Sequence, residues 1–83
     1  GEDHPSVATS LNNIASCLRA QGKHDEALQV HYEALAVRKR ALGEDHPDVA
    51  QSLNNVAMCL WRQDESSREA AGLGREALAI VER

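Results

Sequence analysis

Aromatic side chains are almost missing from this chain. Its 83 residues include no phenylalanine, one tyrosine and one tryptophan. A hydrophobic core must therefore be built from alanine and the branched aliphatic residues. Alanine is the best helix former, whereas β-sheets are enriched in aromatic and β-branched residues. The composition favours an all-α protein whose helices approach one another closely.

Positive charge and long apolar runs are also scarce. Nine lysines and arginines against thirteen aspartates and glutamates give a formal net charge of −4. A nucleic-acid-binding domain would show a basic stripe or patch instead. No run approaches the ~18 apolar residues of a membrane-spanning helix, and no signal peptide is visible. We therefore predict neither nucleic acid nor membrane as a partner, and we expect a cytoplasmic location.

Patterns typical of catalytic, cofactor and metal sites are missing as well. The chain has no glycine-rich phosphate loop, no HExxH motif and no nucleophile elbow. Its two cysteines, Cys17 and Cys59, form no CxxC pair, although structural zinc sites normally need such local pairs. A disulfide between them is not expected, because neighbouring helices lie ~8–10 Å apart and a disulfide needs Cα atoms within ~7 Å. The sequence predicts no enzyme, no cofactor and no metal.

What the chain does have is a block that occurs twice. Residues 1–5, Gly-Glu-Asp-His-Pro, return as residues 43–47, and the pattern of residues 7–18 returns in residues 49–60. The offset is 43 − 1 = 42 residues. Self-similarity at such a period is the signature of a solenoid built from stacked repeats. We therefore predict two repeats, residues 1–42 and residues 43–83.

Each repeat is predicted to contain two helices. Apolar residues in 7–18 are spaced by three, four and seven positions, as on one side of an amphipathic helix. Pro5 suits the first helical position, and Gly22 suits the helix end. Asp3, which lies just before Pro5, can accept hydrogen bonds from the free N–H groups of the first helical turn. The basic cluster 38–40 is expected to complement the dipole at the end of the second helix. The predicted helices are about 5–21, 25–42, 47–63 and 66–83.

The last of these helices is the weakest element. The turn before it is one residue longer than in the first repeat, and Ser66 and Glu69 have capping-box spacing. Gly72 and Gly74 lie inside the predicted helix, and each costs roughly 1 kcal/mol relative to alanine in an exposed helix interior. We expect this helix to fray or bend first.

The two helices of the first repeat carry a further pattern. A small residue late in the first helix is followed by glycine, then by Glu-Ala and Ala-Leu pairs, at Ala15, Gly22, Glu26-Ala27 and Ala34-Leu35. This pattern resembles the tetratricopeptide repeat. That repeat usually has a period of ~34 residues. The longer period found here and the residues of the doubled block are similar to the kinesin light chain type. The resemblance implies two stacked antiparallel helix-turn-helix hairpins with a right-handed superhelical tendency. The family usually has tyrosine where His24 and His31 stand.

The same resemblance implies a function in protein–protein interaction. In tetratricopeptide arrays the first helix of each repeat lines a concave groove, where an extended peptide or a partner helix binds. Asparagine suits such a groove because its carboxamide both donates and accepts hydrogen bonds. The predicted contact residues are Thr9, Asn12, Asn13, Ser16, Arg19, Gln51, Asn54, Asn55, Met58 and Trp61. In the alternative interpretation, Asn13 and Asn55 merely bond across neighbouring helices.

Two interpretations of the whole chain remain open at this stage. Kinesin light chains use such arrays to recognise cargo or adaptor peptides, and the resemblance implies that use here. The alternative is structural, since solenoid repeats cannot bury their faces alone and about three are usually needed. Leu78, Ile80 and Val81 end the last helix with nothing after them to cover them. The second interpretation predicts self-association, by stacking of the open ends or by exchange of a hairpin.

Overall fold

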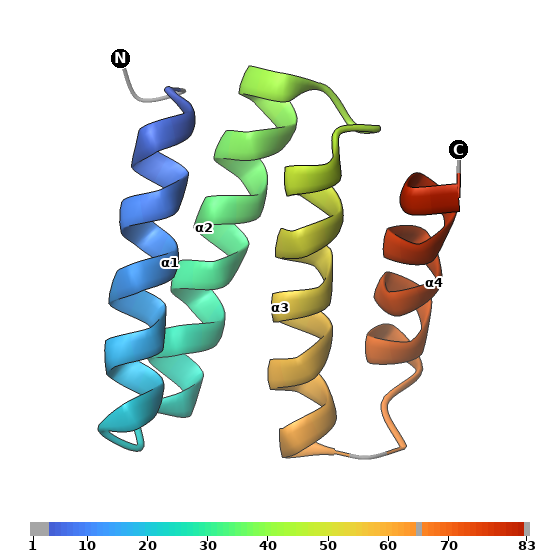
Figure 1. The fold of residues 1–83 in the computed structure, drawn as a ribbon. Helices are drawn as coiled ribbons and strands as arrows, with labels where there is room; N and C mark the ends of the chain where they lie inside the picture. The colour runs from blue at the N-terminus through green and yellow to red at the C-terminus, as the bar shows by residue number, and fades with distance from the viewer. Residues whose placement is uncertain (1–3, 65, 83) are drawn as a thin grey trace.

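The computed structural model describes residues 4–64 and 66–82, and these form four α-helices with no β-strand. The helices are α1 (Pro5–Ala20), α2 (His24–Leu42), α3 (Pro47–Gln63) and α4 (Arg68–Glu82). They lie side by side in chain order, and each packs on the next (Figure 1). The resulting slab measures 29 × 28 × 13 Å. The predicted all-α fold of two stacked antiparallel hairpins is confirmed.

A histidine side chain caps the N-terminus of both α1 and α3. His4 Nδ1 accepts a hydrogen bond from the backbone N–H of Ser6 at 3.1 Å, and His46 Nδ1 accepts one from Asp48 N–H at 3.0 Å. Each ring nitrogen thereby satisfies one of the N–H groups that lack a partner in the first helical turn. Asp3, which was expected to serve these groups in α1, lies outside the described residues. The doubled block is therefore a helix start in which histidine is the cap.

Glycines with positive φ angles end α1 and α2. Gly22 has a φ of +81°. Its N–H donates to the carbonyl of Arg19 at 3.0 Å, and Lys23 N–H donates to the carbonyl of Leu18 at 2.8 Å. This pair of bonds is a Schellman motif, which satisfies carbonyls that the last helical turn leaves free. Gly43 has a φ of +87° after α2, a backbone conformation that a residue with a Cβ adopts only with strain.

The predicted start of the last helix at residue 66 is wrong, because α4 begins at Arg68. Asp64 Oδ1 accepts hydrogen bonds from both the backbone N–H and the hydroxyl of Ser66, at 3.0 and 2.7 Å. Ser66 is therefore held in the turn, and Ser67 Oγ accepts from Ala70 N–H at 3.1 Å in its place. The capping box that was predicted to begin at Ser66 is not formed, and the inserted residue lengthens the turn rather than the helix.

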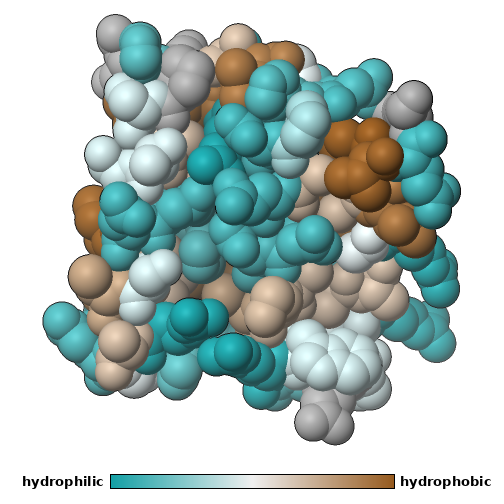
Figure 2. Space-filling view, in the orientation of Figure 1, coloured by the Kyte–Doolittle hydropathy of each residue, from teal (hydrophilic) through white to brown (hydrophobic). Residues whose placement is uncertain are grey.

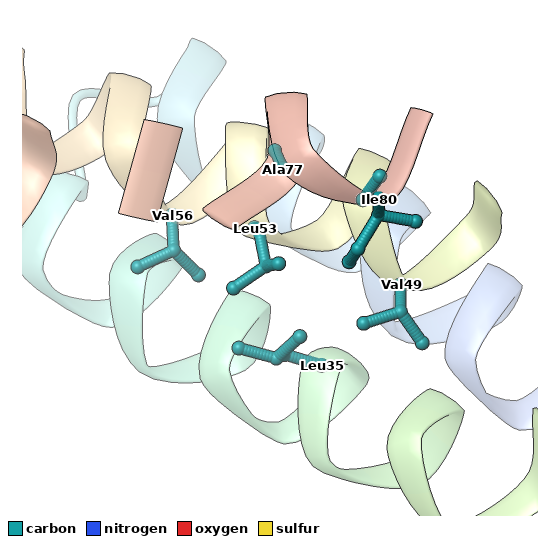
Figure 3. Packing of buried hydrophobic residues seen from close by; sticks show 7 residues of the cluster. Leu35, Val49, Leu53, Val56, Ala77 and Ile80 are labelled. Carbon is teal, nitrogen blue, oxygen red and sulfur yellow. The ribbon is translucent and has the colours of Figure 1, made fainter. Parts of the chain in front are cut away.

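The main hydrophobic core lies where α2, α3 and α4 meet (Figure 3). Leu53 and Val56 of α3 have no exposed surface. A smaller cluster of Ala8, Ala34 and Val37 joins α1 to α2. The buried members of the main core are Leu35, Val49, Ala50, Leu53, Val56, Ala77 and Ile80. Both α2 and α3 have a packed neighbour on each side, while α1 and α4 form the two outer edges (Figure 1).

A tyrosine of α2 ties the first turn of α4 to the first hairpin. Tyr32 donates its hydroxyl hydrogen to Glu69 Oε1 at 2.6 Å. Burial, the hydrogen bond to Glu69 and the charge of that carboxylate together raise the pKa of Tyr32 to about 12. The helix that follows is continuous through Gly72 and Gly74, where an added Cβ would meet no atom within 4 Å. Packing therefore does not require these two glycines.

Candidate partner-binding face

Most of the predicted contact residues lie on the surface of α1 and α3. Met58 and Trp61 are 52% and 51% exposed, which leaves two large apolar side chains of α3 available to a ligand. Asn12 and Asn55 are half-buried. The remaining predicted positions are all exposed, and they are Thr9, Asn13, Ser16, Arg19, Gln51 and Asn54. Hydrophilic atoms cover the middle of the face shown in Figure 2.

Two of the predicted contact residues, Asn12 and Gln51, are bonded to a buried arginine of α2. Arg38 is only 6% exposed. Its Nη1 donates to Ser52 Oγ at 2.9 Å, to Gln51 Oε1 at 3.0 Å and to the backbone carbonyl of Asp48 at 3.2 Å. All three acceptors belong to α3. Arg38 therefore fastens the first hairpin to the second.

Asn12 brings α1 into the same network. With its amide oxygen turned toward Arg38, it accepts from Nη1 at 3.1 Å and from Nη2 at 3.0 Å. Its amide nitrogen then occupies the position 3.4 Å from His31 Nδ1 and faces that ring nitrogen as a donor. This orientation pairs each donor with an acceptor. Asn12 therefore has a structural role between three helices that the sequence did not predict.

The surroundings of His31 favour its neutral form. The residue is 7% exposed. Burial lowers the pKa of His31 from its ordinary 6.5, and the positive charge of Arg19 lowers it further. A neutral ring with its proton on Nε2 can accept a hydrogen bond at Nδ1, which is where the Asn12 amide lies. Protonation of His31 would therefore oppose the network around Arg38.

Acidification is expected to destabilise the fold through His31. Because its pKa is lower in the folded state, the unfolded chain takes up the proton first as the pH falls. The stabilisation is therefore complete above the ordinary pKa of 6.5 and is lost progressively below it. The loss attributable to one group is at most about 1.4 kcal/mol per pH unit. Urea unfolding at about pH 7.5 and about pH 5.5 measures it.

Two variants isolate this effect from the other histidines. His31→Gln should lose less stability than the unmodified protein when the pH is lowered. His24→Gln removes an exposed histidine and should keep the full pH dependence. If His31→Gln and the unmodified protein lost equal stability on acidification, the pH dependence would have to come from another group.

A cavity of about 410 Å³ opens where α1 and α3 end and α2 begins. Arg19 and Arg62 line it, and Asp25 brings in a carboxylate. Gln63 Nε2 donates to Asp25 Oδ1 at 2.7 Å. Among the described residues that line this basic cavity, two guanidinium groups outnumber one carboxylate, so their net charge is positive. The remaining lining residues are Gly22, His24, Ala27 and Cys59.

The charges of Arg19 and Arg62 both affect the pKa of the Cys59 thiol in the wall of the basic cavity. Burial raises the pKa of this thiol, while the charges of Arg19 and of Arg62 each act to lower it. Both guanidinium groups therefore act on the same small volume. An anion bound in the cavity would interact favourably with the two charges together.

A second cavity, of about 250 Å³, lies between α3 and α4. Its walls are mainly apolar, and they consist of Ala57, Met58, Trp61, Arg62, Ala70 and Ala71. Arg62 also lines the basic cavity. The apolar cavity and the basic cavity are therefore neighbours on either side of one arginine.

The fold agrees with a comparison against known families. The profile of the tetratricopeptide repeat matches residues 1–83. The chain belongs to the tetratricopeptide repeat family. Repeats of this family generally mediate protein–protein interaction and are typically non-enzymatic. No curated protein matches the chain.

In this tetratricopeptide protein, α1 and α3 are the first helices of the two hairpins and α2 and α4 are the second. Sequence reasoning assigned Arg38 to a basic cluster at the end of a helix and so missed its role. A signal was available, because Arg38 follows His31 by seven residues and Leu35 by three. Those spacings place all three residues on one side of α2, the side that is buried.

The part of the tetratricopeptide chain that the structure describes contains no group of three histidine, cysteine or acidic side chains that could hold a metal ion. None of its helices combines the length and the apolar character needed to cross a bilayer. Cys17 is exposed and Cys59 half-buried, and both are free thiols. The features that this face offers a ligand are the two cavities and the exposed amides.

Proposed function

We propose that the chain binds an extended segment of a partner protein along the face formed by α1 and α3. The segment places an acidic group between Arg19 and Arg62 and an apolar side chain against Met58 and Trp61. The observation that carries this proposal is the position of Arg62, which lines both the basic and the apolar cavity. An acidic residue and an apolar residue close together in one peptide can therefore occupy both cavities at once.

Charge supports an acidic ligand even though the chain itself has a net charge of −4. The two arginines approach the basic cavity from different helices, and the Asp25 carboxylate in its wall is already hydrogen-bonded to Gln63. A guanidinium group presents a planar fork of donors that matches a carboxylate. Charge complementarity of this kind contributes most to specificity and to the rate of association.

Exposed amides and hydroxyls support recognition of the peptide backbone. Asn13 and Asn54 are exposed on the first helices of the two hairpins, whereas Asn12 is bonded to Arg38. A carboxamide can pair with both the N–H and the carbonyl of an extended chain. In this proposal Thr9 and Ser16 extend the contact along α1.

The residues of the two repeats support a more specific function, which is cargo or adaptor recognition of the kinesin light chain type. The division into repeats 1–42 and 43–83 gives each repeat one first helix on the binding face. A cytoplasmic location fits two free thiols, which are typical of a reducing compartment.

A peptide array followed by affinity measurement tests this function. Peptides that combine aspartate or glutamate with a nearby apolar residue should be retained. Arg62→Gln should weaken their binding by roughly tenfold and reduce its dependence on salt. Arg75→Gln is the matched control, because Arg75 is exposed on α4 and lines neither cavity. Equal losses in the two variants would show attraction to net charge alone and would overturn the proposal.

Two further changes separate the parts of the site. Met58→Ala should relax the preference for an apolar residue while the acidic preference persists. Asn13→Ala combined with Asn54→Ala should weaken the binding of peptides of every sequence, since it removes the proposed backbone contacts, while helicity remains intact. Unchanged affinity in that double variant would remove the asparagines from the site.

A further inference from the structure

We infer that the acidic group held in the basic cavity is a phosphorylated side chain of the partner segment, bound between Arg19 and Arg62 at the N-terminus of α2. The inference rests on the proposed function and deepens it, because it names the chemical class of group that the cavity takes. It makes a phosphate monoester, rather than the carboxylate of aspartate or glutamate, the preferred ligand.

Two guanidinium groups in one cavity favour an anion with more than two oxygens. Arg19 lies in the last turn of α1 and Arg62 in the last turn of α3, and both line the cavity. Each guanidinium group can donate two parallel hydrogen bonds to one anion. A carboxylate has only two oxygens, so a single bidentate arginine occupies both of them. The three terminal oxygens of a phosphate monoester leave acceptors for the second arginine.

Both arginines are available to a ligand. Within residues 4–64 and 66–82, no carboxylate forms an ion pair with Arg19 or Arg62. The Asp25 carboxylate in the wall accepts instead from Gln63 Nε2 at 2.7 Å. Both guanidinium charges act to lower the pKa of the Cys59 thiol, so both lie near one point of the wall. Two like charges held close together repel each other, and a bound dianion offsets that repulsion.

The start of α2 adds hydrogen-bond donors to the same cavity. Gly22, His24 and Asp25 all line it, so the first turn of α2 forms part of the wall (Figure 1). The side chain at the N-cap, Lys23, makes no cap hydrogen bond, whereas side chains cap α1, α3 and α4. The N-terminus of a helix binds anions through its free N–H groups and its dipole. A third phosphate oxygen can therefore accept from α2 while the other two face the arginines.

The charges around the cavity match a phosphate better than a carboxylate. Its two guanidinium groups, the Asp25 carboxylate and the partial charge of about +0.5 at the start of α2 amount to about +1.5. A phosphate monoester carries about −1.5 to −2 at pH 7 and offsets this charge. A single carboxylate leaves part of it unmatched. The cavity volume of about 410 Å³ is also within the range of about 300–1,000 Å³ that is usual for ligand pockets.

Three labelled peptide pools test the inference by fluorescence anisotropy. The pools carry serine, glutamate or phosphoserine at one fixed position, have leucine two residues later, and are randomised elsewhere. The phosphoserine pool should bind at least about tenfold more tightly than the glutamate pool, with the serine pool weakest. In Arg19→Gln, this advantage over glutamate should fall below about threefold, because one bidentate donor is lost. Arg75→Gln removes the same charge from a position outside the cavity and should keep the full advantage.

Asp25→Asn is expected to change the affinity in the opposite direction. It removes the negative charge from the wall, while the amide oxygen can still accept from Gln63. The phosphoserine pool should bind about threefold more tightly to this variant, and the glutamate pool should gain less. An unchanged affinity for phosphoserine would contradict a phosphate position beside Asp25.

The outcomes separate this inference from the proposed function. Equal affinity for the phosphoserine and glutamate pools, with both above serine, would overturn the inference and leave the proposed function standing. Absence of binding by all three pools would overturn both. An advantage of phosphoserine that persists in Arg19→Gln, helical by circular dichroism, would place the phosphate elsewhere. Complete displacement of the phosphoserine pool by about 1 mM inorganic phosphate at constant ionic strength would show a site for the free ion and not for a partner segment.

Discussion

Replacing Arg38 with alanine is expected to lower the free energy of unfolding by about 3 kcal/mol. The residue is 6% exposed and donates to three acceptors of α3, and the Asn12 amide of α1 also faces its guanidinium group. Its removal takes the donor away from these acceptors, of which the Ser52 hydroxyl is buried, and leaves a gap where the aliphatic stem packed. Because the network joins three helices, the loss falls on the contact between the hairpins.

Graded substitutions separate the stem of Arg38 from its charge. Arg38→Met keeps most of the apolar stem but leaves the acceptors unpaired, so we expect a loss of about 2 kcal/mol. Arg38→Lys keeps the charge, but a single ammonium group cannot span acceptors on both α1 and α3 as the planar fork does. We therefore expect lysine to restore only part of the stability.

Thermal and urea unfolding followed by circular dichroism measure these losses. In a domain of this size, 1 kcal/mol shifts Tm by roughly 4–8 °C, so Arg38→Ala should melt at least about 10 °C below the unmodified protein. Arg75→Ala, at an exposed arginine of α4, should change stability by no more than about 0.5 kcal/mol. A loss in Arg38→Ala as small as that of Arg75→Ala would show that the acceptors do not depend on the guanidinium group.

Replacing Leu53 with alanine is expected to cost about 3–4 kcal/mol. Leu53 has no exposed surface and belongs to the core that α2, α3 and α4 share (Figure 3). Truncation removes buried methyl groups and leaves a cavity, and both lower the stability of the folded state. Packed helices on both sides of α3 restrict how far the site can collapse to fill that cavity.

The repeat provides a matched control for this prediction. Leu11 is the equivalent of Leu53 on α1, where it is half-buried against the smaller cluster. The same substitution there should cost about 1–2 kcal/mol, because part of the leucine surface is already in water. Equal losses from Leu11→Ala and Leu53→Ala in urea unfolding would contradict the unequal burial on which the prediction rests.

Local chemistry made the helices predictable. The stop at Gly22 and the starts at Pro5 and Pro47 act within one turn of backbone, so the sequence alone indicates them. The start of α4 is equally local, but its prediction was wrong because two adjacent serines competed for the cap. Asp64 holds Ser66 in the turn and leaves Ser67 to cap the helix.

The exposure and contacts of the candidate face were predictable only in part. The helical spacing that marked Met58, Trp61 and Arg19 also identified exposed residues, because exposure of an amphipathic helix follows its periodicity. The same spacing placed Asn12 and Gln51 among the contact residues, since it says nothing about what a neighbouring helix brings near them. Both of them bond to Arg38.

The sequence by itself determined the repeat, the all-α fold and the ends of most helices, because these depend on residues within a few positions of one another. Only the tertiary structure decided that Arg38 is buried, that Arg62 lines two cavities, and that equivalent residues of the two repeats are unequally buried. Each of these depends on which helices lie side by side. Similar repeats acquire different surroundings when they are stacked, because a helix in the middle has two packed neighbours and a helix at an edge has one.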